Sequence, residues 1–193
     1  MSHDLVVIGA SWGGLDAFRD LLRGLPADLD AAVVIAQHRS PESHPTALCE
    51  LLGGATALAV REGGDKDALQ SGTVYVAAPD YHLLVDRGSL SLSTDEPVQY
   101  ARPSIDVLFE SAAESYRERC VGVVLTGAND DGTRGLARIA ELGGVAIVQD
   151  PKEAARDEMP RAALAAVPSA RVARAAEIAA LLVELCGTAK VAV

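Results

Sequence analysis

A serine with glycines two positions away on either side follows the first apolar run of the chain, in the segment Gly9-Ala10-Ser11-Trp12-Gly13. This G-x-S-x-G spacing is typical of a nucleophile elbow, a strained strand-to-helix turn that lifts a serine hydroxyl clear of the backbone. The N-terminus of the helix after such a turn offers free N–H groups and partial positive charge, which suit a developing oxyanion. The segment therefore favours a serine hydrolase with Ser11 as its nucleophile.

Two other interpretations fit the same glycines. A dinucleotide-binding turn follows the pattern G-x-G-x-x-G, but the middle glycine, where backbone must approach the pyrophosphate, is Ser11 in this chain. The acidic residue expected about 20 positions further on is also absent, since Gln37 and His38 stand there. Alternatively, the glycines serve only close helix–strand packing and Ser11 is an ordinary helix N-cap. Because short motifs match by chance, other residues have to decide among the three interpretations.

A serine nucleophile needs a base to take its proton, and the chain has 4 histidines. His3 precedes the first strand, His44 lies inside a predicted helix and His82 begins a strand. Only His38 directly follows a second buried apolar run, at the carboxyl edge of a parallel sheet where Ser11 also lies and where open α/β sheets place their sites. We predict that His38 is the base; the alternative is a capping or solvent-facing loop histidine.

The acid that orients such a base is expected in the loop after Leu125, where Asp130 and Asp131 stand on the same edge of the sheet. Both are also good N-caps for the next helix, and their spacing does not distinguish them. Asp80 and Asp150 are weaker candidates, because each adjoins a proline in a pair that commonly only makes a turn. The chain order Ser, His, Asp differs from the Ser, Asp, His order of α/β-hydrolases and indicates a different hydrolase family.

The length and composition of the chain limit the number of domains and the class of protein. The 193 residues without a Pro/Ser-rich linker predict one domain spanning residues 1–193. With 49% hydrophobic but only 4% aromatic residues, the chain can build a core of aliphatic side chains, as parallel α/β sheets do. The formal net charge of -10 argues against a nucleic-acid partner. We expect a cytoplasmic protein without membrane insertion, because there is no signal peptide and no apolar run approaches roughly 18 residues.

The three cysteines Cys49, Cys120 and Cys186 lie far apart, each in or beside an apolar run. We expect them to be buried reduced thiols, because their spacing matches neither a C-x-x-C motif nor a metal-ligand set. The sequence predicts neither a metal nor a cofactor.

Continuous apolar runs alternate with amphipathic segments along the chain, which predicts a doubly wound, mostly parallel sheet with helices on both faces. Residues 56–93 differ, because short strand-like runs separated by Gly, Asp and Pro turns predict a small antiparallel, strand-rich insertion there. The predicted core strands are 5–8, 31–36, 121–125, 145–148 and 171–173, the strands of the insertion are 57–60, 73–77, 82–85 and 90–92, and the helices are 15–23, 41–52, 105–116, 133–142, 160–166 and 175–185.

Several strings of this sequence resemble the methylesterase domain of the bacterial chemotaxis enzyme CheB, a protein-glutamate methylesterase. Residues 8–14 are similar to the family's I-G-A-S-T-G-G, and residues 37–38 match its Q-H. Residues 102–109 match R-P-S-V-D-V-L-F, residues 125–132 align without gaps to L-T-G-M-G-N-D-G, and residues 159–161 match M-P-R. The strings occur in the right order over nearly the whole chain, which makes the resemblance specific.

The resemblance implies Ser11 as the nucleophile, His38 as the base and Asp131, rather than Asp130, as the orienting acid. It implies hydrolysis of γ-glutamyl methyl esters on chemoreceptor helices with release of methanol, and deamidation of receptor glutamines. Ser11 would attack the ester carbonyl and form a glutamyl-enzyme that water hydrolyses. No cofactor takes part.

Two positions beside the expected site depart from the family's pattern: Trp12 stands in place of Thr, and Ala128 in place of Met. We expect the backbone N–H groups of Trp12 and Ala128 to hold the oxyanion, since a backbone donor survives a change of side chain. The family's enzyme carries an N-terminal phospho-receiver domain that gates the site. We expect no receiver domain in this chain. The site is then either ungated, controlled by a separate response-regulator partner, or directed at other substrates. The alternative function is a catalytically weak or inactive binding module for a partner other than a chemoreceptor, with Trp12 as an aromatic anchor.

Overall fold

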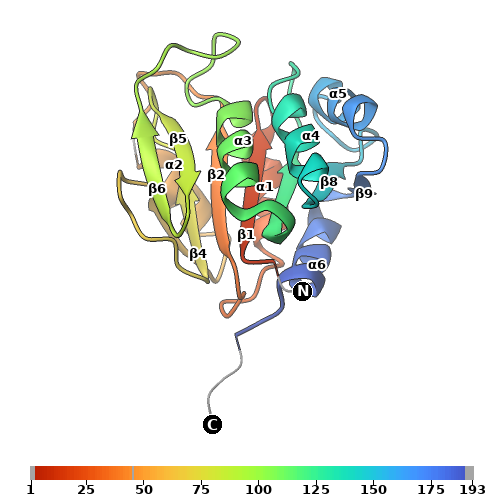
Figure 1. Ribbon diagram of the computed structural model, residues 1–193, viewed down its shortest axis with the longest axis horizontal. Helices are drawn as coiled ribbons and strands as arrows, with labels where there is room; N and C mark the ends of the chain where they lie inside the picture. The colour runs from red at the N-terminus through yellow and green to blue at the C-terminus, as the bar shows by residue number, and fades with distance from the viewer. Residues whose placement is uncertain (1–2, 45, 190–193) are drawn as a thin grey trace.

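A seven-stranded sheet forms the centre of the computed structural model, which describes residues 3–44 and 46–189. Its strand order is β3-β4-β2-β1-β7-β8-β9, and every adjacent pair is parallel (Figure 1). The order of the strands reverses beside β1, which places the site of an open α/β sheet at the carboxyl ends of β1 and its neighbours. The strands of the sheet are β1 (Leu5–Ala10), β2 (Ala32–Gln37), β3 (Ala59–Glu62), β4 (Thr73–Val76), β7 (Cys120–Val124), β8 (Val145–Gln149) and β9 (Arg171–Ala173).

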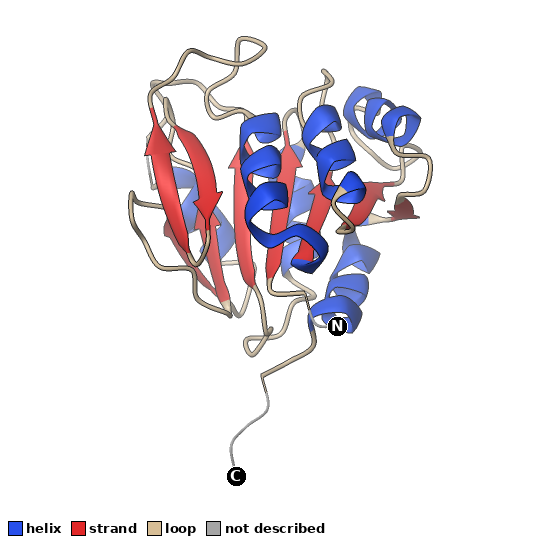
Figure 2. Cartoon of the chain, in the orientation of Figure 1, coloured by secondary structure: helices blue, strands red, loops and turns tan. Residues whose placement is uncertain are grey.

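Helices cover both faces of the sheet, which confirms the doubly wound fold predicted from the sequence (Figure 2). The central strands are almost entirely apolar because successive side chains point to opposite faces and both faces are covered. In β1, Val6 and Ile8 pack into one core, whereas Leu5 and Val7 pack into the other. The first core is covered by α1 (Gly14–Leu22), α2 (Ala47–Gly53) and α6 (Ala175–Cys186), and the second by α3 (Ile105–Tyr116), α4 (Thr133–Glu141) and α5 (Glu158–Ala166).

The segment predicted as an antiparallel insertion divides into two parts. Its second half forms an antiparallel hairpin of β5 (His82–Asp86) and β6 (Ser89–Ser93), as expected. The first half differs from the prediction, because β3 and β4 join the main sheet as parallel strands. All four residues of β4 are buried, so this short strand belongs to the core of the main sheet.

Two local expectations are also corrected. The second helix begins at Ala47 rather than at residue 41, so His44 precedes the helix instead of lying within it. The sequence has a proline directly after His44, and a residue before proline disfavours the helical conformation. Of the three free cysteines, Cys120 and Cys186 are buried as expected, whereas Cys49 is partly exposed.

The helices α3 and α4 pack closely against each other on one face of the sheet. A Cβ atom at Gly135 of α4 would lie only 2.4 Å from Cβ of Phe109 in α3. Glycine at this position therefore brings the two helices together, and both begin at the carboxyl edge of the sheet (Figure 1).

Within residues 3–44 and 46–189, no helix has the length and apolar character needed to cross a membrane.

Candidate active site

Ser11 lies in the turn between β1 and α1 and is partly exposed. Gly13 has a φ of 76°, in the left-handed region that glycine adopts without strain, and a Cβ there would lie 2.6 Å from Cβ of Ala155. The Ser11 N–H donates to the carbonyl oxygen of Thr126 at 2.9 Å, and the Gly14 N–H donates to the Ser11 carbonyl at 3.0 Å. The turn is thus held against the loop that follows β7, with the Ser11 side chain left at its outer side.

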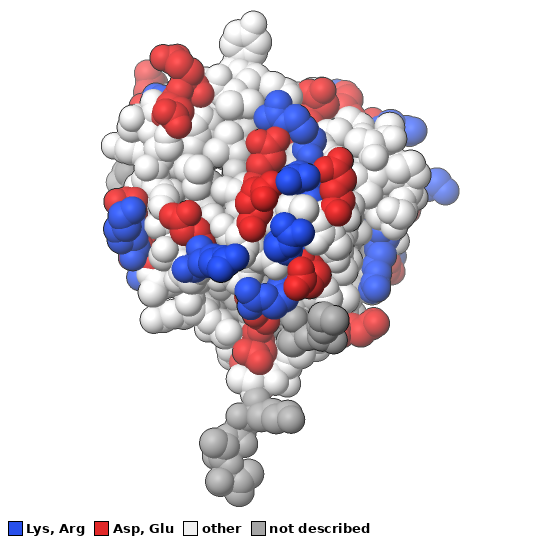
Figure 3. Space-filling model, viewed as in Figure 1, with Lys and Arg blue, Asp and Glu red and all other residues white. Residues whose placement is uncertain are grey.

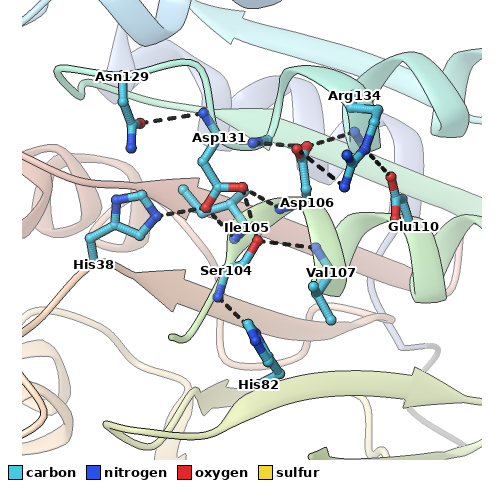
Figure 4. A network of polar contacts seen from close by, with 12 residues as sticks. His38, His82, Ser104, Ile105, Asp106, Val107, Glu110, Asn129, Asp131 and Arg134 are labelled. Carbon is cyan, nitrogen blue, oxygen red and sulfur yellow. Dashed lines mark hydrogen bonds and ion pairs between the residues drawn. The ribbon is translucent and has the colours of Figure 1, made fainter. Parts of the chain in front are cut away.

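His38 directly follows β2 and continues the pairing with β1, because its N–H donates to the carbonyl of Ala10 at 3.2 Å. Its ring lies between two of the predicted site residues. Nδ1 is 3.2 Å from Oγ of Ser11. Nε2 is 2.6 Å from Oδ2 of Asp131 (Figure 4). Because a carboxylate only accepts, the Nε2–H donates to Asp131 and leaves Nδ1 free to accept from the Ser11 hydroxyl.

Asp131 is fully buried, and both of its carboxylate oxygens are occupied (Figure 4). Besides the bond from His38, Oδ2 accepts from the Ile105 N–H at 2.7 Å. Oδ1 accepts from the Ser104 hydroxyl at 2.9 Å and from the Asp106 N–H at 2.9 Å. The carboxylate therefore binds the N-terminus of α3, where free N–H groups and the helix dipole favour a negative charge.

These contacts decide the ionisation of Asp131. Burial alone raises the pKa of this carboxyl, but the hydrogen bonds from His38 and from the N–H groups of Asp106 and Ile105 outweigh burial and hold the pKa below its ordinary value of 3.8. Asp131 is therefore a carboxylate at neutral pH and can keep the His38 ring in the orientation that presents Nδ1 to Ser11.

The other aspartates considered from the sequence lie elsewhere. Asp130 is exposed, although it is the immediate neighbour of Asp131. Asp80 forms an ion pair with Arg102 at 2.6 Å. Asp150 accepts from the N–H of Lys152 within a turn. Of these candidates, the structure brings only Asp131 to His38.

A second serine and histidine also belong to this network: Ser104, which the sequence analysis did not single out, and His82, which it set aside as the base. The Ser104 hydroxyl donates to Asp131 and accepts from the Val107 N–H, so Ser104 is the N-cap of α3. Nδ1 of His82 accepts from the Ser104 backbone N–H at 3.2 Å, and its Nε2–H donates to the Glu96 carbonyl at 3.1 Å. The available signal was the string R-P-S directly before the predicted helix 105–116, and this string does not reveal the contacts.

The two N–H groups expected to hold an oxyanion belong to loops beside Ser11. Among the residues that the structure describes, no group accepts from the backbone N–H of Trp12 or of Ala128. The loop after β7 comes close to the nucleophile, because a Cβ at Gly127 would lie 3.0 Å from Cβ of Ser11. The Thr126 hydroxyl fixes the turn to this loop by donating to the Trp12 carbonyl at 2.9 Å. The role of the two N–H groups stays a prediction.

The surroundings of the site differ on its two sides. The Trp12 side chain is 66% exposed, and the Arg156 guanidinium lies 5.8 Å from the centre of its ring. On the other side, a cleft of about 430 Å³ is lined in part by His38, Tyr100 and Asn129. This cleft borders His38, whereas Ser11 is not among its lining residues and is partly exposed beside it.

The doubly wound sheet and the hydrogen-bonded series Ser11, His38 and Asp131 at its carboxyl edge define an α/β serine hydrolase. Residues 6–182 match the family model described as CheB methylesterase. The chain belongs to the CheB methylesterase family.

Individual relatives support this assignment. A chain from Leptospira interrogans named for protein-glutamate methylesterase and protein-glutamine glutaminase activities is 41% identical over 186 residues, which cover 96% of both chains. The protein-glutamate methylesterase/protein-glutamine glutaminase of Symbiobacterium thermophilum is 40% identical over 158 residues, or 81% of this chain and 43% of that protein. The crystal structure of the Thermotoga maritima CheB methylesterase catalytic domain superposes with a TM-score of 0.89 at 30% identity and covers 96% of this chain and 100% of that one.

Proposed function

We propose that this protein is a protein-glutamate methylesterase that hydrolyses γ-glutamyl methyl esters on methylated chemoreceptors and also deamidates receptor glutamines. The observation that carries the proposal is the continuous hydrogen-bonded series from the Ser11 hydroxyl through His38 to the Asp131 carboxylate, in a member of this family. A serine, a base and an orienting acid in this order are what acyl transfer to water requires.

The proposed reaction begins with attack of Ser11 Oγ on the ester carbonyl while His38 Nδ1 takes the hydroxyl proton. The imidazolium is stabilised by Asp131, to which its Nε2–H donates at 2.6 Å. The tetrahedral oxyanion accepts from the N–H groups of Trp12 and Ala128, and one such donor is typically worth about 3 kcal/mol. Collapse expels methoxide, which leaves as methanol with the proton from His38. Water then attacks the glutamyl-enzyme with His38 again as base, and the products are a glutamate side chain and free Ser11.

The setting of this reaction is proposed from the family and the sequence. Methylated receptors are cytoplasmic-facing protein substrates, so we place the enzyme in the cytoplasm, with neither metal nor cofactor in the reaction. A separate response regulator is the proposed means of control. One domain over residues 1–193 carries the activity in this proposal.

The proposal is tested by methanol release from membranes that contain methylated chemoreceptors, with Ser11→Ala as the control variant. Release by the wild-type protein that disappears in Ser11→Ala supports the esterase. Ammonia release from receptors with glutamine at the same positions tests the deamidase activity in the same way. Equal release by both proteins, or none by either, would contradict the assignment of Ser11 or of the substrate.

The second candidate function is a binding module with little or no turnover. It is favoured by Trp12, whose large exposed side chain stands where the family has Thr. An exposed aromatic beside a catalytic serine can anchor a partner or restrict the pocket. Binding of a methylated receptor peptide without methanol release would favour this alternative.

A further inference from the structure

Asp106 is a buried carboxylate that the proposed reaction does not use. It lies in the first turn of α3, and its side chain is 1% exposed. Its Oδ1 accepts from the Gly132 N–H at 2.9 Å and from the Gly135 N–H at 2.8 Å, at the start of α4 (Figure 4). Its Oδ2 has no hydrogen-bond partner among the described residues and lies 3.7 Å from the Arg134 guanidinium.

The two buried aspartates form a reciprocal arrangement. Asp131, just before α4, accepts from N–H groups at the N-terminus of α3, whereas Asp106 of α3 accepts from N–H groups at the N-terminus of α4. The start of α3 is therefore bound by a carboxylate just before α4, and the start of α4 by a carboxylate of α3. Gly132, which donates to Asp106, is the residue next to Asp131 in the chain. The backbone of Asp131 is thus held from α3 independently of its side chain.

Stability alone does not account for a carboxylate at position 106. Burial raises the pKa of Asp106, and the neighbouring charge of Asp131 raises it further. Two like charges close together in the interior oppose folding, and such an arrangement is more common at functional sites than in ordinary cores. The same carboxylate, however, joins the start of α4 to the start of α3, through the N–H groups of Gly132 and Gly135.

We propose that Asp106 is a positioning residue for the reaction: by holding the Gly132 and Gly135 N–H groups, it keeps Asp131 Oδ2 within hydrogen-bond distance of His38 Nε2. The proposal rests on the catalytic roles proposed above. Its action is indirect, because Asp106 reaches His38 only through the loop that carries Asp131. What matters for this role is the acceptor at Oδ1, not the negative charge.

Three variants separate positioning from charge and from packing. Asp106→Ala removes the acceptor, and we expect kcat for a small methyl ester to fall by about 10²-fold with KM within about twofold, since a displacement of about 1 Å in a catalytic group costs that much. Asp106→Asn keeps an acceptor oxygen for both N–H groups, and we expect it to restore kcat to within about fivefold of wild type. Arg134→Met is the matched control, because Arg134 contacts the same carboxylate but lies among the paired acidic and basic side chains of α3 and α4 at the surface (Figure 3). It should leave kcat unchanged.

A double-mutant cycle tests whether Asp106 acts through Asp131. In an Asp131→Asn background, adding Asp106→Ala should lower kcat by no more than about threefold, because the contact that Asp106 supports is already lost. The His38 Nε2–H signal in ¹⁵N-histidine-labelled protein gives a readout without turnover: it should move or broaden in Asp106→Ala and stay near its wild-type shift in Asp106→Asn.

The outcomes distinguish this proposal from the proposed function. Full activity of Asp106→Ala, or an undiminished 10²-fold loss when it is added to Asp131→Asn, would overturn positioning by Asp106 while leaving the esterase intact. Equally severe loss in folded Asp106→Asn would also overturn it, since charge would then be the decisive property. No Ser11-dependent turnover by the wild-type protein would instead refute the proposed function, and the histidine signal would still test the geometry. Should Asp106→Ala fail to fold, Asp106→Asn still tests the proposal, because a loss of kcat well beyond fivefold or a moved His38 Nε2–H signal in this variant would overturn it.

Discussion

Two serine–histidine pairs meet at the same aspartate, and only one of them has the geometry of a nucleophile and its base. In the first pair, the Ser11 side chain faces His38 Nδ1, and His38 has its other nitrogen on Asp131. In the second pair, His82 accepts from the backbone N–H of Ser104 rather than from its hydroxyl. The Ser104 hydroxyl itself donates to Asp131.

The two pairs differ in exposure to solvent and in whether the histidine has a nitrogen free to accept from the serine hydroxyl. Both nitrogens of His82 are occupied by backbone groups, and both His82 and Ser104 are buried. A buried serine whose hydroxyl donates its hydrogen bond to a carboxylate rather than to a histidine has neither a base nor a path to substrate. The second pair therefore supports the first by ordering Asp131.

The largest expected difference between the pairs is in turnover. Ser11→Ala should lower kcat by at least about 10⁴-fold, as loss of a serine nucleophile does in other hydrolases. Ser104→Ala should cost only a few-fold, because it removes one hydrogen bond worth about 1 kcal/mol from Asp131. Initial rates on a small methyl ester measure both. A Ser104→Ala variant as inactive as Ser11→Ala would reverse the comparison.

The next largest effect separates the adjacent aspartates. Asp131→Asn should lower kcat by about 10⁴-fold, because an amide at this position no longer holds the His38 ring with Nε2–H directed at a carboxylate. Asp130→Asn is the matched control and should change kcat by less than about twofold, since Asp130 is exposed. The same esterase assay with circular dichroism of each variant checks the expectation, and a strong effect of Asp130→Asn would contradict the observed geometry.

These residues also show how far the sequence could lead. Periodicity predicted the sheet and the helices because each strand of the core is a continuous apolar run buried on both faces. The prediction failed for β3 and β4, since a strand of only 4 residues carries too little pattern to distinguish a parallel core strand from an antiparallel one. Pattern alone could not predict which element lies beside it.

The candidate site was predictable only where a local motif was present. Ser11 and His38 follow directly on apolar strands, whereas spacing left Asp130 and Asp131 open and the family resemblance alone favoured Asp131. The contacts of Asp106 with Gly132 and Gly135 depend on how two helix starts meet across 26 and 29 positions of the chain. No local propensity encodes such a contact, so it appears only in the folded protein.

A smaller effect concerns stability, and it should run opposite to the effect on turnover. Ser104→Ala should lower the free energy of unfolding by about 1–2 kcal/mol, because Ser104 caps α3 and also satisfies Asp131 in the interior. Ser11→Ala should change it by less than about 0.5 kcal/mol, since Ser11 is partly exposed. Urea unfolding of the two variants at neutral pH checks this order, and equal destabilisation would count against a purely supporting role for the buried pair.

The smallest expected effect concerns the two buried carboxylates, Asp131 and Asp106. They should make the free energy of unfolding depend on pH in different ways. Hydrogen bonds hold the pKa of Asp131 below its ordinary value of 3.8, so ionised Asp131 stabilises the fold above that pH, and this contribution is lost as the pH falls through the lowered pKa. Burial raises the pKa of Asp106, so the folded state holds its proton more tightly than the unfolded chain, and stability falls as the pH rises from 3.8 through the raised pKa. The stability of Asp106→Asn relative to wild type should therefore rise as the pH rises from 3.8 through the raised pKa of Asp106. The stability of Asp131→Asn relative to wild type should instead fall as the pH rises from the lowered pKa of Asp131 to 3.8. Urea unfolding of the three proteins between pH 3 and about pH 7 compares the slopes, and slopes of the same sign for the two variants would mean that the carboxylates do not differ as their contacts require.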